Sequence, residues 1–152
     1  MLTNVNICLK LNPNSHLGYY VQGVALYFLG KYDDSVESYR KAIKIDPSFV
    51  KAYNNLGNAF SDTGKREEAI ESYRKAIKID PNYAYAYNGL GSALYNIGKY
   101  EEAIESYRKG IKIDPNFAYA YNNLGNALDD IGKKEEAIES YRKAIKIDNN
   151  YK

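Results

Sequence analysis

Few residues of this chain are of the types that carry out catalysis, and the sequence does not group them with the partners that catalysis requires. His16 is the single histidine and Cys8 the single cysteine. One imidazole without a nearby nucleophile or carboxylate has little to act on, so we expect a surface or packing role for His16. We expect Cys8 to be an inert, buried thiol.

Two further patterns have simpler explanations than chemistry. Gly57, Gly64 and Lys65 resemble a phosphate-binding loop, but two residues too many separate the glycines, and Arg66 stands where Ser or Thr would bind magnesium. Acidic pairs at helix starts indicate a solvated surface, where the negative side chains interact favourably with the helix dipole. These pairs are Glu67 with Glu68 and Glu101 with Glu102. We therefore predict no enzyme activity, no cofactor and no metal.

The strongest regularity is a repeat of 34 residues. Prolines at positions 13, 47, 81 and 115 follow one another at this interval. The segment 64–97 matches the segment 98–131 at all but seven positions. A fixed period of this size indicates stacked supersecondary units, each of which contacts its neighbours, rather than one globular core.

Each repeat contains two helical patterns separated by a glycine. In the segment 84–97, apolar and small residues recur at the spacing of one helix face. Gly98 is predicted to take the left-handed conformation that stops this helix. Residues 101–114 form the second helix, which Pro115 ends, and Asn116 is predicted to cap the next helix. The apolar face of the second helix comprises Ala103, Ile104, Tyr107, Ile111 and Ile113.

These residues resemble the tetratricopeptide repeat pattern of an aromatic residue, Leu-Gly, a large residue, Ala, an aromatic residue, Ala and Pro. The second copy matches with Tyr53, Leu56, Gly57, Phe60, Ala69, Tyr73, Ala76 and Pro81. The third matches with Tyr87, Leu90, Gly91, Leu94, Ala103, Tyr107, Gly110 and Pro115. The fourth has Asn149 in place of proline, and the first is the most divergent.

The resemblance implies an all-α, right-handed superhelical solenoid of antiparallel helix pairs that covers the whole chain as a single array. The predicted divisions are a half repeat at 1–15 and full repeats at 16–49, 50–83, 84–117 and 118–151. In the half repeat, Cys8 falls where Ala42 and Ala76 fall.

Glycine recurs once in each first helix, at positions 23, 57, 91 and 125. We predict that each of these glycines faces a small residue, at 35, 69, 103 and 137 respectively, so that two helix backbones approach closely. Gly110 replaces the alanine of the other copies and should weaken its helix by about 1 kcal/mol.

The side of each first helix that the core does not use is the predicted binding surface. In tetratricopeptide repeat arrays this side lines a concave groove, and the resemblance implies that it binds a peptide or protein. Amides can pair with an extended backbone as donor and acceptor, and tyrosine supplies contact area at low entropic cost. The predicted groove residues are Tyr20, Val24, Tyr27, Phe28, Lys51, Asn54, Asn55, Asn58, Tyr85, Asn88, Ser92, Tyr95, Tyr119, Asn122, Asn123 and Asn126. The alternative is a general bias toward Asn and Tyr in this composition.

Known subtypes of the family narrow the choice of ligand. The chaperone-tail clamp is absent, because Tyr20 and Val24 occupy its first pair of positions. The chain is similar to the arms of O-linked N-acetylglucosamine transferases, in which an asparagine ladder precedes the leucine. Asn55 and Asn123 resemble two rungs, and the ladder is broken at the other two equivalent positions, by Val21 and Gly89.

The predicted groove changes in character along the chain. The first full helix, 16–29, contains no charged residue, whereas the fourth copy offers Asn122, Asn126, Asp129 and Asp130. An exposed aromatic patch commonly marks an interaction site. We expect a ligand to lay apolar residues toward the N-terminal end and polar or basic residues toward the C-terminal end.

Self-association is a second predicted property. The sequence stops at Lys152, directly after the last predicted helix, whereas repeat stacks usually end in a capping helix. Ile138 and Ile145 have the phase of Ile104 and Ile111, so we expect them to be exposed and to dock on another copy. The competing functions are therefore an end-to-end assembly module or a fragment of the substrate-recruiting arm of a larger enzyme.

Composition limits the partners. The net charge is only +2, so no strong field favours nucleic acid. No apolar run approaches the roughly 20 residues of a membrane span, and a single cysteine fits a reducing compartment. We predict a soluble, cytoplasmic scaffold that binds protein or extended peptide, with no nucleic-acid or membrane partner.

Overall fold

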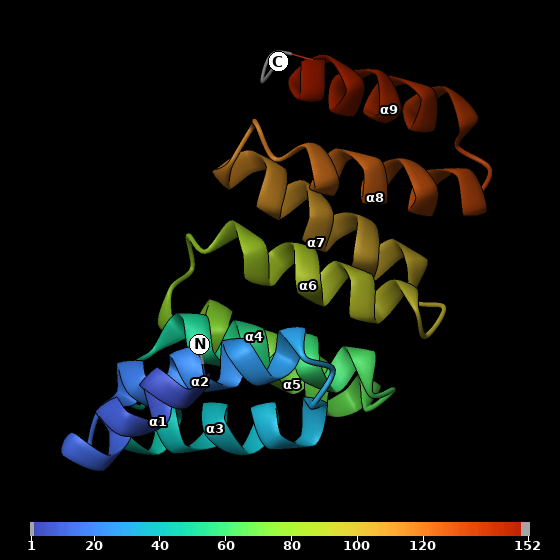
Figure 1. The fold of residues 1–152 in the computed structure, drawn as a ribbon. Coiled ribbons are helices and arrows are strands. Elements are labelled where there is room, and N and C mark those ends of the chain that lie inside the picture. Colours follow the sequence, from blue (N-terminus) through green and yellow to red (C-terminus); the bar gives the residue numbers. More distant parts are fainter. Residues whose placement is uncertain (1, 150–152) are drawn as a thin grey trace. The chain divides into compact units, whose positions relative to one another are not determined.

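The computed structural model describes residues 2–149, and all regular structure in this range is helical (Figure 1). The side chains of residues 2, 4, 5, 6 and 8 are not described, so the prediction for Cys8 lies outside the described residues. The nine helices of this range are α1 (Leu2–Leu11), α2 (His16–Phe28), α3 (Tyr32–Ile45), α4 (Val50–Asp62), α5 (Arg66–Ile79), α6 (Ala84–Tyr95), α7 (Tyr100–Ile113), α8 (Ala118–Asp130) and α9 (Lys134–Asn149).

The chain divides into two compact units, residues 1–80 and 81–152. In unit 1, α2 pairs with α3 and α4 pairs with α5, while α3 packs on α4 and α1 packs on α2. In unit 2, α6 pairs with α7, α8 pairs with α9, and α7 packs on α8. Each unit thus contains two antiparallel helical hairpins, which confirms the predicted all-α class. We call α2, α4, α6 and α8 the first helices; the repeat boundaries themselves stay a prediction.

The turn inside each hairpin is closed by glycine, as the sequence predicts. Gly98 has φ 78°, a value that L side chains rarely adopt. The next amide, Lys99 N–H, reaches back to the carbonyl oxygen of Leu94 (3.0 Å). This backbone bond satisfies a carbonyl at the end of α6 and reverses the chain after it. Equivalent glycines with positive φ follow α2, α4 and α8.

The turn between hairpins differs from the prediction. Asn116 does not cap α8, because Phe117 is the N-cap residue and makes no side-chain capping bond. Instead, the backbone N–H of Asn116 donates to Asp114 Oδ1 (3.0 Å). Asp114 lies before Pro115 in an extended conformation, so its carboxylate can close a turn over the next two residues. Asn116 therefore lies one residue too early to be the cap.

The core of each hairpin is organised around a glycine and a tyrosine. A Cβ added to Gly91 would lie 2.6 Å from the ring of Tyr107, and Gly23, Gly57 and Gly125 face Tyr39, Tyr73 and Tyr141 in the same way. The predicted small-residue partners, such as Ala103, are buried but are not the nearest groups. The prediction that each glycine faces a small residue was wrong, because tyrosine lies one helical turn beyond the small residue and its ring extends across to the glycine.

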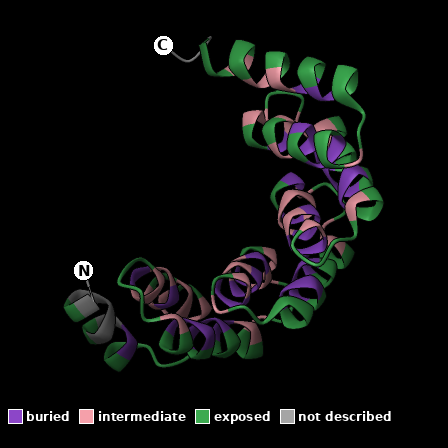
Figure 2. Cartoon of the chain, turned by 90° about the vertical axis from the view of Figure 1, so that its right-hand side faces the viewer, coloured by how far each residue is buried: buried purple, intermediate pink, exposed green. Residues whose placement is uncertain are grey.

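Buried residues lie on the sides of the helices that face one another within each unit (Figure 2). Tyr39 is 1% exposed and Tyr107 is 2% exposed. His16, the first residue of α2, packs its ring edge-on against Phe49 at 5.2 Å between centroids, which confirms its packing role. No helix among the described residues combines the length and the apolar character that crossing a bilayer would require.

The same substitution at two glycines of one hairpin is expected to have opposite effects. Gly91→Ala places a methyl group inside contact distance of Tyr107 and should destabilise by roughly 1–3 kcal/mol. Gly110→Ala should stabilise by up to about 1 kcal/mol, because alanine restricts the unfolded chain. Its Cβ would lie 3.3 Å from the Ala84 carbonyl oxygen, and the equivalent Ala76 is fully buried. Urea unfolding of both variants measures the two values; equal effects would contradict the glycine–tyrosine packing.

Alkaline pH is expected to weaken the fold. Burial raises the pKa of Tyr39, Tyr73 and Tyr107 above the usual 10. Their contribution to stability is fully present below about pH 10, where folded and unfolded chains are both protonated. Above pH 10 these tyrosines lose their protons in the unfolded chain before they do so in the folded chain. The free energy of unfolding therefore falls by up to about 1.4 kcal/mol per pH unit for each tyrosine.

Urea unfolding measured from neutral pH to strongly alkaline pH tests this expectation. Tyr107→Phe removes one titrating group and should make the alkaline decline shallower. Tyr119→Phe, at a tyrosine that is 76% exposed, is the matched control and should leave the slope unchanged. A free energy of unfolding that stays constant above pH 10 would contradict the burial of these phenols.

Candidate functional site

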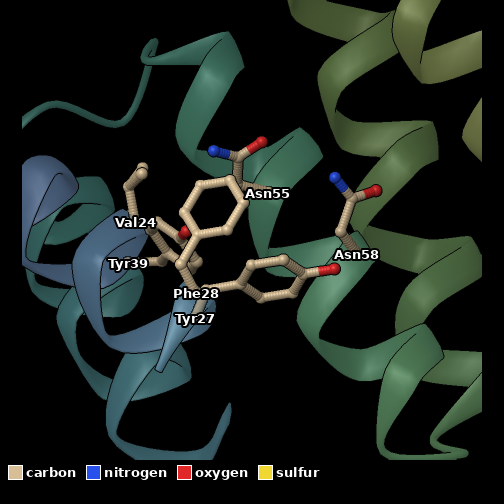
Figure 3. Close-up of a pocket in the computed structure, with 6 residues that line it drawn as sticks. All are labelled: Val24, Tyr27, Phe28, Tyr39, Asn55 and Asn58. Atoms are coloured by element: carbon tan, nitrogen blue, oxygen red, sulfur yellow. The ribbon is translucent and has the colours of Figure 1, made fainter. Parts of the chain in front are cut away.

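The first helices of unit 1 enclose a small cavity on the predicted binding side (Figure 3). The cavity has a volume of about 110 Å³ and is lined by Val24, Tyr27, Phe28, Tyr39, Asn55 and Asn58. Figure 3 shows the Tyr27 ring extending from α2 toward Asn58 on α4. Phe28 is 81% exposed, which is unusual for a large aromatic side chain beside a cavity. We call this site the unit 1 cavity.

Unit 2 contains a cavity of the same construction. It has a volume of about 190 Å³ and is lined by Ser92, Tyr95, Asn96, Tyr107, Asn123 and Asn126. Each of these residues follows its counterpart in the unit 1 cavity by 68 positions, which is two repeats. We call it the unit 2 cavity. The two units therefore carry the same site, built from a first helix, the tyrosine of its hairpin and two asparagines of the next first helix.

Four of the six lining positions are identical between the two cavities, and two differ. The shared residues are Tyr27 and Tyr95, Tyr39 and Tyr107, Asn55 and Asn123, and Asn58 and Asn126. Val24 and Phe28 in unit 1 are replaced by Ser92 and Asn96 in unit 2. The rim of the cavity is thus apolar in unit 1 and polar in unit 2.

The two asparagines predicted as ladder rungs bridge neighbouring first helices. Asn55 Nδ2 donates to the hydroxyl of Tyr20 (3.2 Å), and Asn123 Nδ2 donates to Asn88 Oδ1 (3.1 Å). Both pairs are 35 residues apart. Gly89 holds the equivalent position in α6 and has no side chain to donate. These asparagines therefore fix the spacing of two first helices as well as lining a cavity.

Core tyrosines orient the second pair of asparagines. The Tyr73 hydroxyl donates to Asn58 Oδ1 (2.7 Å), and the Tyr141 hydroxyl donates to Asn126 Oδ1 (2.8 Å). Tyr107 makes the corresponding bond to Ser92 Oγ (3.2 Å). Because the tyrosine ring is held against glycine in the core, its hydroxyl is a fixed donor. The amide oxygen is thereby engaged, which directs the amide nitrogen of each asparagine elsewhere.

A tyrosine–aspartate pair stands at each cavity. The hydroxyl of Tyr27 donates to Asp62 Oδ2, and that of Tyr95 donates to Asp130 Oδ2. The bond to Asp130, together with partial burial, raises the pKa of Tyr95 to about 12. Burial and Asp62 raise the pKa of Tyr27 well above its usual value. Both phenols are therefore protonated donors, and both carboxylates are acceptors.

The remaining predicted groove residues lie outside the two cavities. Lys51, Asn122 and Tyr119 are exposed, and Asn88 is half-buried. Tyr85 packs on Phe117 with 5.0 Å between ring centroids, although it is 58% exposed. Asn54 is the exception, because it is buried with 7% exposure and its Nδ2 donates to Asn55 Oδ1 (3.3 Å). Asn54 therefore supports a cavity wall, and its prediction as a contact residue is corrected.

Sequence reasoning missed four groups that the structure brings to the cavities. These are Tyr39, Tyr107, Asn96 and Asp62. A signal for Asp62 exists at twice the repeat length, since Asp62 and Asp130 recur 68 residues apart, as Tyr27 and Tyr95 do. The core tyrosines recur in every repeat, and Asn96 has no such signal. Among the residues whose side chains the structure describes, no group of three or more His, Cys, Asp or Glu is placed to hold a metal ion.

Comparison with known proteins agrees with this architecture. The family model described as "TPR repeat" matches residues 23–64, 57–98 and 91–132, and the model "Tetratricopeptide repeat" matches residues 118–151. No curated protein matches the sequence.

Solved structures of a protein titled MamA are similar to this chain. One has a TM-score of 0.86 and 30% identity, and the alignment covers 99% of this chain and 88% of that chain. A second has a TM-score of 0.82 and 30% identity over 97% of this chain and 81% of that one. A third structure, of MamA from Desulfovibrio magneticus RS-1, has a TM-score of 0.85 and 23% identity, and the alignment covers 98% of this chain and 84% of that chain. At this identity it supports the fold alone. The chain belongs to the tetratricopeptide repeat family.

Proposed function

We propose that this protein is a non-catalytic scaffold that binds an extended peptide segment of a partner along its first helices. Tetratricopeptide repeats serve as protein-interaction modules. The observation that carries the proposal is the recurrence of one cavity in both units, with four identical lining side chains.

The lining groups suit a peptide backbone. Asparagine offers both a donor and an acceptor, so it can pair with either group of a peptide unit. The core tyrosines hold Asn58 and Asn126 in one orientation, and the donor of each is not bonded within the described part of the chain. A preoriented amide loses little freedom when a ligand binds, which favours affinity.

The rims of the two cavities favour different side chains of a ligand. Phe28 and Val24 on α2 present apolar surface, and α2 carries no Asp, Glu, Lys or Arg. Ser92 and Asn96 present polar groups at the same positions in unit 2, and α8 ends in Asp129 and Asp130. A segment bound to unit 1 is expected to present an apolar side chain, and a segment bound to unit 2 is expected to present polar or basic side chains.

Replacing Phe28 separates binding from folding. Phe28→Ser removes an exposed side chain, so the free energy of unfolding should change by less than about 0.5 kcal/mol. Affinity for peptides selected on the parent chain from a random peptide library should fall about tenfold or more, as for loss of an aromatic anchor. Calorimetric titration of the selected peptides measures this change.

The matched control is Leu29→Ser. Leu29 is the neighbouring residue, is also apolar and is 61% exposed, but does not line the cavity. Its substitution should leave peptide affinity unchanged. Equal affinity of the parent and Phe28→Ser for every selected peptide would reject the unit 1 cavity as the binding site.

Self-association is a second candidate function, favoured by the surface of α9. Ile138 is 49% exposed and Ile145 is 61% exposed. Their equivalents in α7, Ile104 and Ile111, are buried and half-buried where α8 packs on α7. Ile145 also lines a shallow cavity of about 320 Å³ together with Tyr119. A second copy docked on this face would bury apolar area at roughly 25 cal/mol per Å², less the cost of association.

Sedimentation velocity over a concentration series tests the second candidate. The parent chain should sediment faster as concentration rises, and Ile138→Lys with Ile145→Lys should remove the dependence. Ile7→Lys, at an exposed isoleucine of α1, is the control for added charge. A monomeric parent at millimolar concentration would refute self-association through α9.

A further inference from the structure

We propose that the tyrosine–aspartate pair in each unit is a subsite for an arginine side chain of the bound peptide. The inference rests on the proposed peptide-binding function and names the ligand chemistry that the two cavities share. Its elements are an aromatic ring on one first helix, a carboxylate at the tip of that ring on the next first helix, and an adjacent asparagine amide.

The pairs are built identically. Asn58 and Asp62 are four residues apart on α4, so they project from the same side of the helix, and Asn126 and Asp130 repeat this spacing on α8. The ring that ends at the carboxylate lines the cavity in both units. A second tyrosine backs it, since Tyr32 packs edge-on against Tyr27 at 5.4 Å and Tyr100 against Tyr95 at 5.3 Å.

Among the described residues, the carboxylates of these pairs have no cationic partner. Exposed glutamates of the second helices pair with lysine one turn later, as Glu37 does with Lys41 (2.7 Å) and Glu105 with Lys109 (2.7 Å). In the described range 2–149, no Lys or Arg lies within ion-pair distance of Asp62 or Asp130. Each uses Oδ2 for a phenol, so Oδ1 is left to accept from a ligand.

Their position is unfavourable for the helix that carries them. Asp62 is the last residue of α4, and Asp130 is the last residue of α8. The C-terminal end of a helix carries partial negative charge, so an aspartate there is unfavourable for the helix. Aspartate at both equivalent positions nevertheless adds negative potential beside each cavity, and this potential would attract a cationic group.

Arginine fits these groups better than lysine. A guanidinium is planar and weakly hydrated, so it can stack on the Tyr27 or Tyr95 ring while it donates to Oδ1 of the aspartate. In unit 1, the exposed Phe28 ring and Val24 can cover the aliphatic part of the side chain. An arginine with an apolar neighbour is therefore expected in unit 1, and an arginine with a polar neighbour in unit 2.

Titration of the isotope-labelled full chain with Nα-acetyl-arginine N-methylamide tests the proposal. This probe has a neutral backbone and one charged group. Nuclear magnetic resonance should show saturable, millimolar shifts of the side-chain amides of Asn58 and Asn126. The citrulline analogue, which has the same shape and no charge, should bind about tenfold more weakly or worse, as expected for loss of charged hydrogen bonds.

Each unit serves as the control for the other. Asp62→Asn removes the charge and keeps an oxygen that can accept from Tyr27, so the Asn58 response to arginine should weaken about tenfold while the Asn126 response stays. Asp130→Asn should do the reverse, to a smaller extent because Asp129 remains. Glu67→Gln removes an equal charge at the start of α5 and should change neither response.

Three results would overturn the inference: equal binding of arginine and citrulline, persistence of the arginine response in Asp62→Asn with Asp130→Asn, or lysine binding as tightly as arginine. Failure here is distinguishable from failure of the proposed function. If the arginine probe fails while Phe28→Ser still weakens selected peptides, the peptide site stands without the basic subsite. If Phe28→Ser changes nothing while arginine binds, the subsites exist but the proposed peptide site is wrong.

Discussion

The contact between a helix glycine and a tyrosine ring is the constraint on which each hairpin depends. The absence of a side chain at Gly91 leaves space that the Tyr107 ring fills, and any Cβ there would overlap the ring. The ring is thereby buried and held in one place, while its hydroxyl donates to Ser92 Oγ, on the residue that follows the glycine in the first helix. One packing contact thus fixes both the helix spacing and a donor on the predicted binding side.

This coupling explains why the asparagines serve two purposes. Asn58 and Asn126 accept from core tyrosines, and Asn55 and Asn123 bond the preceding first helix. A buried or half-buried amide without a partner would cost free energy, so these bonds make polar residues tolerable beside the core. The same bonds leave the amides in fixed orientations at the cavity walls, where a ligand would meet them.

Charge is divided between the two kinds of helix. The second helices carry most of the charged residues, and glutamate and lysine pair there at a spacing of four residues, in an order that supports an exposed helix. The first helices carry few charges, and two of their aspartates, Asp62 and Asp130, are bonded to phenols rather than to cations. The acidic and basic side chains of the second helices therefore neutralise one another, whereas the first helices, on the predicted binding side, carry more negative than positive charge.

The sequence alone determined the helical hairpins, their order and the glycine turn inside each hairpin, because these depend on local spacing. Three local features set where the helices begin and end: apolar residues at helical intervals, the positive φ of Gly98, and Pro115. Each acts on residues only a few positions away. It also placed Tyr27, Phe28, Asn55 and Asn58 on one side of their helices, since helix geometry fixes which positions share a face. The burial of Asn54 and the closure of a turn by Asp114 in place of Asn116 depend instead on competition between neighbouring polar groups, which spacing does not reveal.

Only the tertiary structure decided which residues meet. The glycines contact tyrosine rings because side-chain length, not sequence spacing, sets what crosses between two helices. The pairs that form the cavities, such as Tyr95 with Asp130, are 35 residues apart and join successive first helices. A contact at that separation depends on how one hairpin stacks on the next, so the 34-residue period concealed a site that recurs at twice its length.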